Sequence, residues 1–421
     1  MTDAQPVRST APSVHALAAG LDVARPLALL QRMVRFDSRT ETPGEVQLAK
    51  SLVDYMSELG LQAWLDEVSP GRYNAVGVFK GTGRGVPGAA SLLFNGHIDT
   101  NPATEGWTVD PWGAHTTDEV IYGLGVSNMK AGCASYLSAV EALIHGGFRP
   151  AADVILTFVV GELQGGIGTV KMIEHGVRAD YFINCEPTDV QALTLHAGAF
   201  NFTVELTGVT RHLSKREESV DAIAAACALV PRLNAMTFSG AADERHGEVN
   251  RCNVGVIHGA LGRSLEEWRP PQIADFVRLV GTGRYAPSQS VESVLADLRR
   301  ELDRLESEFP GLRAEVFPQE KMTDRPDMPP FEVSADSRIV RTVNSAYELI
   351  RDAAQPTGAI QPCCFFGSDA AHLSKAGMEG VVCGPGGKYN TMPDERVELV
   401  DYYDMIRMHM LAIEEVCGRG N

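Results

Sequence analysis

The chain lacks a long hydrophobic run, an excess of basic charge and any Cys-x-x-Cys pair. Without a stretch of about 18 apolar residues, no membrane-spanning helix is expected. The first residues also lack the basic start and apolar stretch of a secretory signal. Lys and Arg number 37 against 54 Asp and Glu, a net charge of −17. This acidity argues against nucleic acid or an anionic membrane as a partner.

The eight cysteines are scattered, without the paired spacing of a thiolate zinc site. We expect them to be reduced and mostly buried, as is typical of a cytoplasmic protein. Hydrophobic residues make up 44% of the chain, enough to form a core.

The first half of the sequence alternates buried strands with helices. Short apolar runs at 90–100, 152–162 and 179–187 have the length of buried strands. Helical spacing of apolar residues is clear at 43–60 and 129–147. This alternation predicts an α/β fold with a mostly parallel sheet and helices on both faces. In such a sheet, functional residues gather at the carboxyl ends of the strands.

A different order of elements begins near residue 196. A strand, a helix, two strands, a helix and a strand follow one another, at 199–208, 218–235, 252–259, 275–285, 290–308 and 313–319. This is a β-α-β-β-α-β order, and a buried strand of the first type returns near 381–387. We therefore predict a catalytic α/β domain, residues 1–195 and 322–421, interrupted by an inserted domain at 196–321.

Polar residues follow several of the predicted strands: His97 with Asp99, Asn128, Glu162 and Glu186. Histidine is the commonest metal ligand, Asp99 could orient its ring, and Glu162 could be a general base. Each has a structural alternative. These are a hydrogen-bonded histidine in a turn, a helix N-cap at the asparagine or the serine before it, and surface carboxylates beside turns. Their shared position at one sheet edge favours a common site.

Eight stretches between about residues 90 and 400 resemble, in order, those of a metallopeptidase family. The family includes carboxypeptidase G, acetylornithine deacetylase, succinyl-diaminopimelate desuccinylase and aminoacylase. The stretches are FNGHIDTNPATEGWTVDPW, IYGLGVSNMKAG, GELQGGIGT, NCEPT, GVTRHLS, NVGVIHG, GSDAAHL and GPGGKYNTMPDERV. The resemblance implies that the inserted domain is a lid and dimerisation domain. It also implies a homodimer or a higher even-numbered homo-oligomer.

The sequence departs from this family at the ligands of the second of two metal ions. Asn128 stands at the position of the bridging Asp, Leu163 replaces a Glu, and residues 389–395 contain no His. His97 and Glu186 match the remaining ligands of the first ion. The resemblance thus implies one divalent transition metal ion per subunit, held weakly by His97, Asn128 and Glu186. Manganese is expected first, with Zn, Co or Fe as alternatives.

The same resemblance implies roles for other residues. Glu162 matches the catalytic base, and Asp99 matches the residue that orients the metal-binding histidine. His212 of the lid matches a residue that stabilises negative charge in the neighbouring subunit's site. Asn253 and Arg284 match residues that hold a substrate carboxylate, a task suited to the planar guanidinium.

Ser368 and Asn390 are also expected to bind substrate, with Gly367 and Asp369 lining the same cleft. His372 is a candidate substitute ligand, although we expect it to lie on a helix surface.

These features predict a hydrolase that cleaves a C–N bond of a small anionic substrate, using metal-activated water and Glu162. The altered ligand pattern also resembles that of a member of this family that hydrolyses an aromatic amine, and this narrower resemblance implies hydrolytic deamination of 5-nitroanthranilate to 5-nitrosalicylate by nucleophilic aromatic substitution. An activated ring carbon needs less polarisation than an amide carbonyl. One alternative is an N-acyl amino acid deacylase or carboxypeptidase of the same family. Another is a non-catalytic carboxylate-binding or scaffold protein, against which Glu162 argues because binding alone needs no base.

Overall fold

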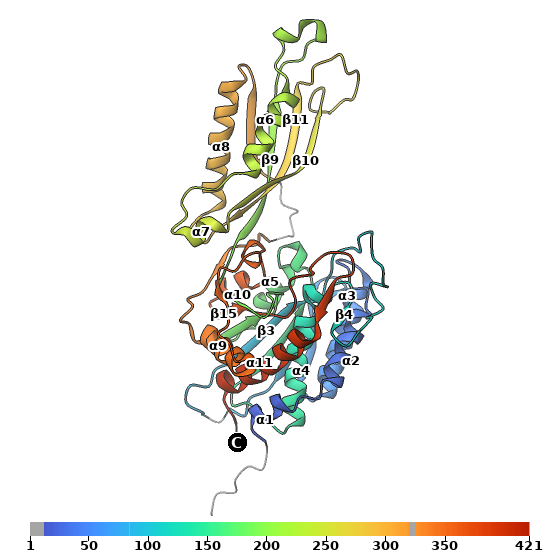
Figure 1. Cartoon of the computed structure of the whole chain (residues 1–421), viewed down its shortest axis with the longest axis vertical. Helices are drawn as coiled ribbons and strands as arrows, with labels where there is room; N and C mark the ends of the chain where they lie inside the picture. Colours follow the sequence, from blue (N-terminus) through green and yellow to red (C-terminus); the bar gives the residue numbers. More distant parts are fainter. Residues whose placement is uncertain (1–11, 84, 320–325, 421) are drawn as a thin grey trace, which may run out of the picture. The chain divides into compact units, whose positions relative to one another are not determined.

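A computed structural model describes residues 12–83, 85–319 and 326–420 of the chain. Two compact units are present (Figure 1). The first comprises Met1–Leu195, Val333–Cys363 and Ser368–Asn421, and the second comprises His196–Glu332 and Cys364–Gly367. The second unit thus continues past the boundary at 321 expected from the sequence. No helix in the described ranges has the length and apolar character needed to cross a bilayer.

An eight-stranded sheet forms the centre of the first unit. Its strand order is β1 (Gln62–Ser69), β2 (Arg72–Phe79), β5 (Val154–Val159), β3 (Leu92–His97), β6 (Tyr181–Asn184), β15 (Glu379–Val382), β7 (Ala192–Leu193), β14 (Thr357–Gly358). The four strands from β5 to β15 are parallel, whereas β1 and β2 form an antiparallel edge. Every residue of β3 and β5 is buried, as is typical of mostly apolar strands in a parallel sheet that is covered on both faces.

Helices cover both faces of this sheet, as predicted. On one face, α4 (Ala131–His145) and α11 (Leu399–Cys417) pack on β3, where Phe94 stacks against Tyr136 at 5.5 Å and meets His409 at 4.8 Å. The opposite face carries α5 (Ile167–Glu174), whose Thr169 hydroxyl accepts a hydrogen bond from Asn95. Helix α10 (Ala370–Lys375) packs beside α5. The remaining larger helices are α1 (Val14–Ala19), α2 (Ala24–Val34), α3 (Pro43–Glu58) and α9 (Arg338–Arg351).

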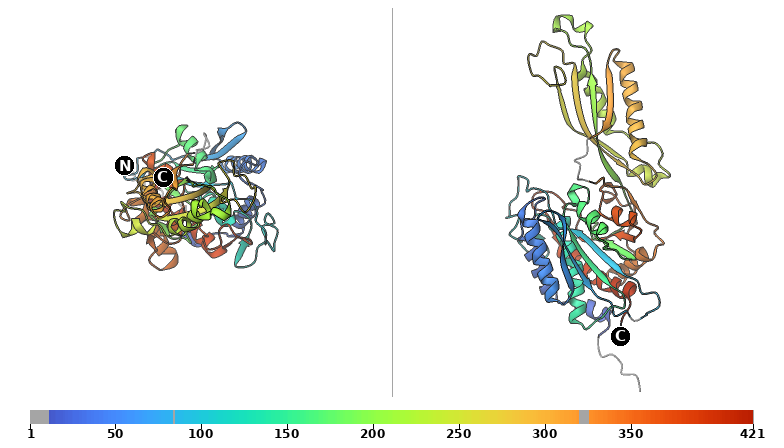
Figure 2. Two further views of the ribbon diagram at one scale, coloured as in Figure 1. Left: turned by 90° about the horizontal axis from the view of Figure 1, so that it is seen from above. Right: turned by 180° about the vertical axis from the view of Figure 1, so that it is seen from behind.

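The second unit is a four-stranded antiparallel sheet with two long helices, and its fold can be followed in Figure 2. The chain runs through β9 (Gly198–Thr207), α6 (Ala222–Asn234), β10 (Arg251–Ala260), β11 (Phe276–Tyr285), α8 (Val291–Glu308) and β12 (Arg313–Pro318). This confirms the predicted β-α-β-β-α-β order, to which a short helix α7 (Glu244–Glu248) is added. Phe202 and Leu279 are buried on the sheet with Leu229 of α6 and Leu298 of α8.

A short two-stranded ribbon joins distant parts of the first unit. Strand β4 (Val120–Tyr122) pairs antiparallel with β16 (Arg396–Glu398), so that Tyr122 lies opposite Arg396. The ribbon brings the segment before β16 against the turn that leads from β4 into α4.

Candidate metal centre

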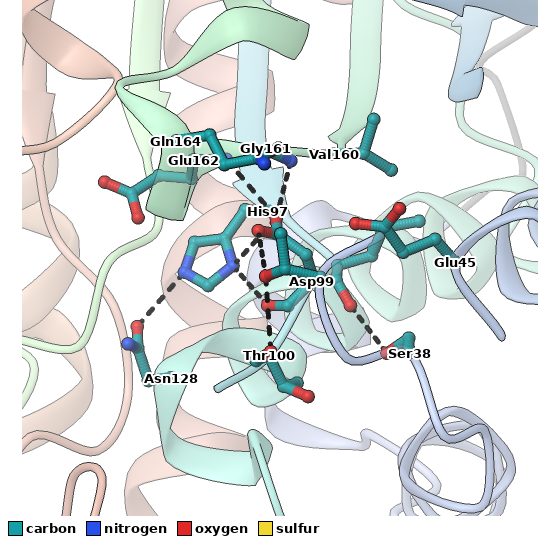
Figure 3. Close-up of polar contacts among 12 residues, drawn as sticks. Ser38, Glu45, His97, Asp99, Thr100, Asn128, Val160, Gly161, Glu162 and Gln164 are labelled. Carbon is teal, nitrogen blue, oxygen red and sulfur yellow. Dashed lines mark hydrogen bonds and ion pairs between the residues drawn. The ribbon is translucent and has the colours of Figure 1, made fainter. Parts of the chain in front are cut away.

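His97 is the last residue of β3 and is 1% exposed. Its Nδ1–H donates to the main-chain oxygen of Asp99 at 2.8 Å, so in the neutral ring that binds a metal ion the lone pair is on Nε2. That atom faces Asn128 Oδ1 at 3.2 Å (Figure 3) and Glu186 Oε1 at 3.8 Å. Three electron-rich atoms therefore converge on one point.

Glu162 completes this group. Single ligand atoms of His97, Glu162 and Glu186 all lie within 4.8 Å of one another. The Oε1 atom of Glu186 is buried without a hydrogen-bond partner among the described residues, a costly arrangement unless a cation satisfies it. A nitrogen donor with oxygen donors, one of them orphaned, fits a divalent transition metal ion. His97, Asn128 and Glu186 would hold it.

The electrostatics of this group also favour a cation. Burial opposes a charge on His97, but the surrounding carboxylates of Glu186, Asp99, Glu162 and Asp369 raise the pKa of its imidazole to about 10, so a proton occupies Nε2 unless a metal ion takes its place. Burial is the main cause that raises the pKa of both Glu186 and Glu162, and in Glu162 the repulsion from Glu186 adds to it. The cluster is therefore rich in acidic groups whose negative charge a dication would offset.

The carboxylate of Asp99 holds the turn that carries Glu162. Its Oδ1 accepts hydrogen bonds from Gly161 N at 2.9 Å and Glu162 N at 3.3 Å, and its Oδ2 accepts one from the Thr40 hydroxyl at 3.1 Å. Oδ1 lies 3.7 Å from His97 Nδ1. The expected contact with the histidine therefore comes from the main-chain oxygen of Asp99. The carboxylate is engaged by the free N–H groups at the start of the turn.

His372 is buried, contrary to the expectation of a helix-surface residue. It is 9% exposed, and its Nε2–H donates to the main-chain oxygen of Gly165 at 2.8 Å. It thus supports the Glu162 turn from the α10 side and does not ligate within this group. The short helix α10 packs against α5, and this packing covers the imidazole.

A further tether on the Glu162 turn comes from Gln164, which sequence reasoning missed. Its side chain donates to Glu41 Oε1 at 2.6 Å and accepts from Arg72. Arg72 in turn forms two hydrogen bonds with the buried Glu45, at 2.7 and 2.8 Å. No local pattern marks these residues, because the contacts join segments far apart in the chain.

The turn Val126–Lys130 carries Asn128 into α4. Neither Ser127 nor Asn128 caps this helix, which begins without a side-chain cap. The Ser127 hydroxyl instead donates to Asn390 Oδ1 and accepts from Gly387 N at 3.0 Å. The side-chain oxygen of Asn390, a predicted substrate ligand, is thus engaged within the protein.

Ser368, Asp369 and Leu163 are the other positions of the first unit for which the sequence predicts a role at the site or its loss. Ser368 is fully buried, and its hydroxyl accepts from Ala370 N at 3.3 Å at the start of α10. Asp369 is 1% exposed, and burial raises its pKa to about 7 although Thr169 opposes this shift. Leu163 is 36% exposed and supplies no ligand where the resemblance expects a carboxylate.

His212, Asn253 and Arg284 belong to the second unit. His212 is exposed, and its Nδ1 accepts from Ser214 N at 3.2 Å, capping a short helical turn. The β-register places Asn253 opposite Thr282 and Arg251 opposite Arg284. Asn253 and Arg284 therefore share the sheet face opposite α6 and α8. Their roles at the metal centre remain predictions.

The profile of peptidase family M20/M25/M40 matches residues 93–415, which is most of the chain. The chain belongs to this family. As an M20 family member it is a metal-dependent hydrolase that acts on C–N bonds, and the resemblance drawn from its motifs is confirmed.

Relatives agree with the assignment to the M20 family. The chain is 26% identical to N-formyl-4-amino-5-aminomethyl-2-methylpyrimidine deformylase of Bacillus subtilis, over 89% of this chain and 95% of that protein. It is 27% identical to acetylornithine deacetylase of Myxococcus xanthus, over 85% and 87%. The crystal structure of aminopeptidase PepT from Bacillus cereus matches the fold with a TM-score of 0.74 and 20% identity, covering 93% of this chain and 98% of that one.

Proposed function

We propose that this M20 family member hydrolyses a C–N bond with a single divalent metal ion per subunit. The observation that carries the proposal is the group formed by the buried His97 and Glu186 and the half-buried Glu162, with Asn128 at its edge. Within the described ranges it is the one group of three or more His, Cys, Asp or Glu residues close enough to share an ion. Leu163 carries no ligand atom, and residues 389–395 lack the histidine that the resemblance expects for a second ion.

A bound dication would lower the pKa of a water molecule and make it a nucleophile at neutral pH. Glu162 is the base that accepts the proton of this water, and it later delivers that proton to the leaving nitrogen. Asp99 holds the backbone of Glu162 in place through Gly161 N and Glu162 N. Manganese is our first choice of metal, with Zn, Co and Fe as alternatives, since a site with one carboxylate ligand does not select strongly.

The substrate that we propose is 5-nitroanthranilate. Water attacks the ring carbon that carries the amino group, and the electron pair is taken up by the ring and its nitro group. The C–N bond then breaks, the nitrogen leaves as ammonia, and 5-nitrosalicylate is formed. Such a carbon needs one polarising contact fewer than an amide carbonyl, in keeping with the missing second-ion ligands.

The second unit would supply the contacts to the anionic substrate. Arg284 and Asn253 share one face of its sheet, and a guanidinium binds a carboxylate through two parallel hydrogen bonds. His212 would act in the site of the neighbouring subunit, where it would stabilise the negative charge that develops on the ring. Ser368 and Asn390 are proposed to line the substrate cleft from the first unit.

Deacylation of an N-acyl amino acid is the second candidate. It is favoured by the relatives, whose names describe a deformylase and a deacetylase. Both reactions need the same metal ion, the same base and the same residues that bind the carboxylate of the substrate. They differ only in the carbon atom that the water attacks.

We further propose that the chain forms a homodimer, or a larger even-numbered assembly, in the cytoplasm. Strand β10 is an edge strand whose Val256 and Ile257 are 43% and 52% exposed, an unusual surface for an isolated sheet edge. The eight cysteines are all unpaired, as suits a reducing compartment.

Metal content and product release test this proposal together. The purified protein is loaded with Mn or Zn, the ions per subunit are counted, and 5-nitroanthranilate is offered beside a panel of N-acetyl amino acids. One ion per chain with ammonia released from the aromatic amine alone supports the deamination. Acetate released from the panel would establish the deacylase instead. Absence of both an ion and turnover would leave a carboxylate-binding protein.

A further inference from the structure

The C-terminal segment that lacks the family's histidine still reaches the metal centre. We call residues 384–395 the C-terminal strap. The β4–β16 ribbon holds its end in place, and Gly123 N donates to the main-chain oxygen of Glu395 at 2.9 Å. The strap therefore lies along the turn that presents Asn128.

The side chain of Glu395 makes the closest contacts with this turn. Its Oε1 accepts hydrogen bonds from Ser127 N at 2.8 Å and Asn128 N at 2.9 Å, and its Oε2 accepts one from Gly125 N at 3.2 Å. Glu395 is 1% exposed. Bonds from backbone N–H groups to a buried carboxylate are strong and directional.

Two further contacts fix the same turn. The Ser127 hydroxyl is held between Asn390 and Gly387 of the strap. On the opposite side, the buried Lys130 donates to the main-chain oxygen of Phe36 at 2.9 Å, and its ammonium group attracts the Glu395 carboxylate. The backbone on both sides of Asn128 is thus constrained.

We propose that Glu395 is a positioning residue that fixes the amide oxygen of Asn128 toward Nε2 of His97. This inference rests on the proposed single-metal function and extends it. A neutral amide attracts a dication less than a carboxylate does. Retention of the ion therefore depends on a preformed ligand geometry, which groups outside the ligand set provide. In this chain the strap contributes to the metal site by holding a ligand instead of supplying one.

The test compares Glu395→Gln and Glu395→Leu with the wild type in manganese titrations followed by electron paramagnetic resonance, without substrate. Loss of a residue that supports a ligand commonly weakens metal binding by about 10- to 100-fold. We expect a rise in Kd of that size for the Leu variant. The Gln variant keeps one acceptor oxygen for Ser127 N and Asn128 N, so a smaller rise is expected.

Glu141→Leu is the matched control. Glu141 is a buried carboxylate on α4 that accepts from the Tyr55 hydroxyl at 2.8 Å. If Glu395 has the role proposed, Glu141→Leu should lower the thermal stability but leave the manganese Kd unchanged.

Equal manganese affinity of wild type and both Glu395 variants would overturn the inference and leave the single-metal function standing. A wild-type protein that binds neither Mn nor Zn would overturn the proposed function, and the positioning role with it. If the Leu variant does not fold, the Gln variant decides between these outcomes, because it alters a single contact.

Discussion

His409 should make the first unit sensitive to acid. The imidazole extends from α11 into the core and packs against Phe94 of β3. Its Nδ1 lies 3.3 Å from the Ser135 hydroxyl. Burial lowers its pKa from 6.5 to about 3. The unfolded chain binds a proton at this histidine below about pH 6.5, whereas the folded chain does not until about pH 3. The free energy of unfolding must therefore fall as the pH is lowered through this interval.

The size of the effect follows from the two pKa values. Between pH 7.5 and pH 4.5 the wild type should lose roughly 2.5 kcal/mol of stability at His409 alone. The full loss, reached below pH 3, is about 5 kcal/mol. Asparagine does not titrate, so a His409→Asn variant should lose less stability than the wild type on acidification. Near neutrality this variant should be less stable than the wild type.

Urea denaturation at a series of pH values measures this difference. Three of the four tryptophans, Trp64, Trp107 and Trp112, lie in the first unit, so fluorescence reports mainly on its unfolding. His15→Asn, at an exposed position on α1, is the control and should follow the wild type. Parallel pH dependence of the wild type and His409→Asn would refute the conclusion that the buried imidazole stays neutral.

Three further predictions concern the metal centre. Asn128→Asp should lower the manganese Kd by roughly tenfold or more, because a carboxylate replaces a neutral ligand. Isothermal titration should still show one ion per chain. An unchanged Kd would mean that residue 128 does not bind the ion. Glu162→Gln should reduce kcat by about 100-fold or more while the protein still binds metal, as steady-state kinetics and metal analysis would show; near-normal turnover would remove Glu162 from the role of base. Arg72→Met breaks the pair with a buried carboxylate and should lower stability by roughly 3 kcal/mol and kcat several-fold, with manganese affinity unchanged. The control is Arg351→Met, which breaks the ion pairs of α9 with Asp401 and Asp404 of α11. It should lower the melting temperature and leave kcat unaltered. Equal effects of the two variants on kcat would exclude a specific role of Arg72.

Local sequence pattern was sufficient for the elements that are periodic and apolar. Strands β3 and β5 are mostly apolar, and β9 alternates, so both kinds of strand could be recognised. The β1–β2 hairpin was not predicted, although Pro70 and Gly71 mark its turn. The amphipathic helices α9 and α11 were also missed, although both pack on the sheet that had been predicted.

At the site, the predictable residues are those at the ends of parallel strands. His97 ends strand β3, and Glu186 follows the neighbouring strand β6; the carboxyl ends of the two parallel strands lie at one edge. Glu395 and Arg72 could not be found in this way. Their contacts join segments far apart in sequence, and a single buried acid or arginine carries no local signature. The residues that support a site depend on tertiary packing, whereas the proposed metal ligands can be predicted from their positions at the ends of strands.

The insertion of the second unit also orders events during synthesis. Strand β15, helix α11 and the C-terminal strap follow the inserted segment in the chain, yet β15 pairs with β6 and Glu395 bonds to the turn at residues 125–128. The ribosome therefore releases the whole inserted unit before the first unit can close its sheet. Such long-range pairing is slow to form. A nascent chain that stops short of residue 395 has His97 and Glu186 but no Glu395 to support Asn128, so high-affinity metal capture should wait until the last part of the chain has emerged.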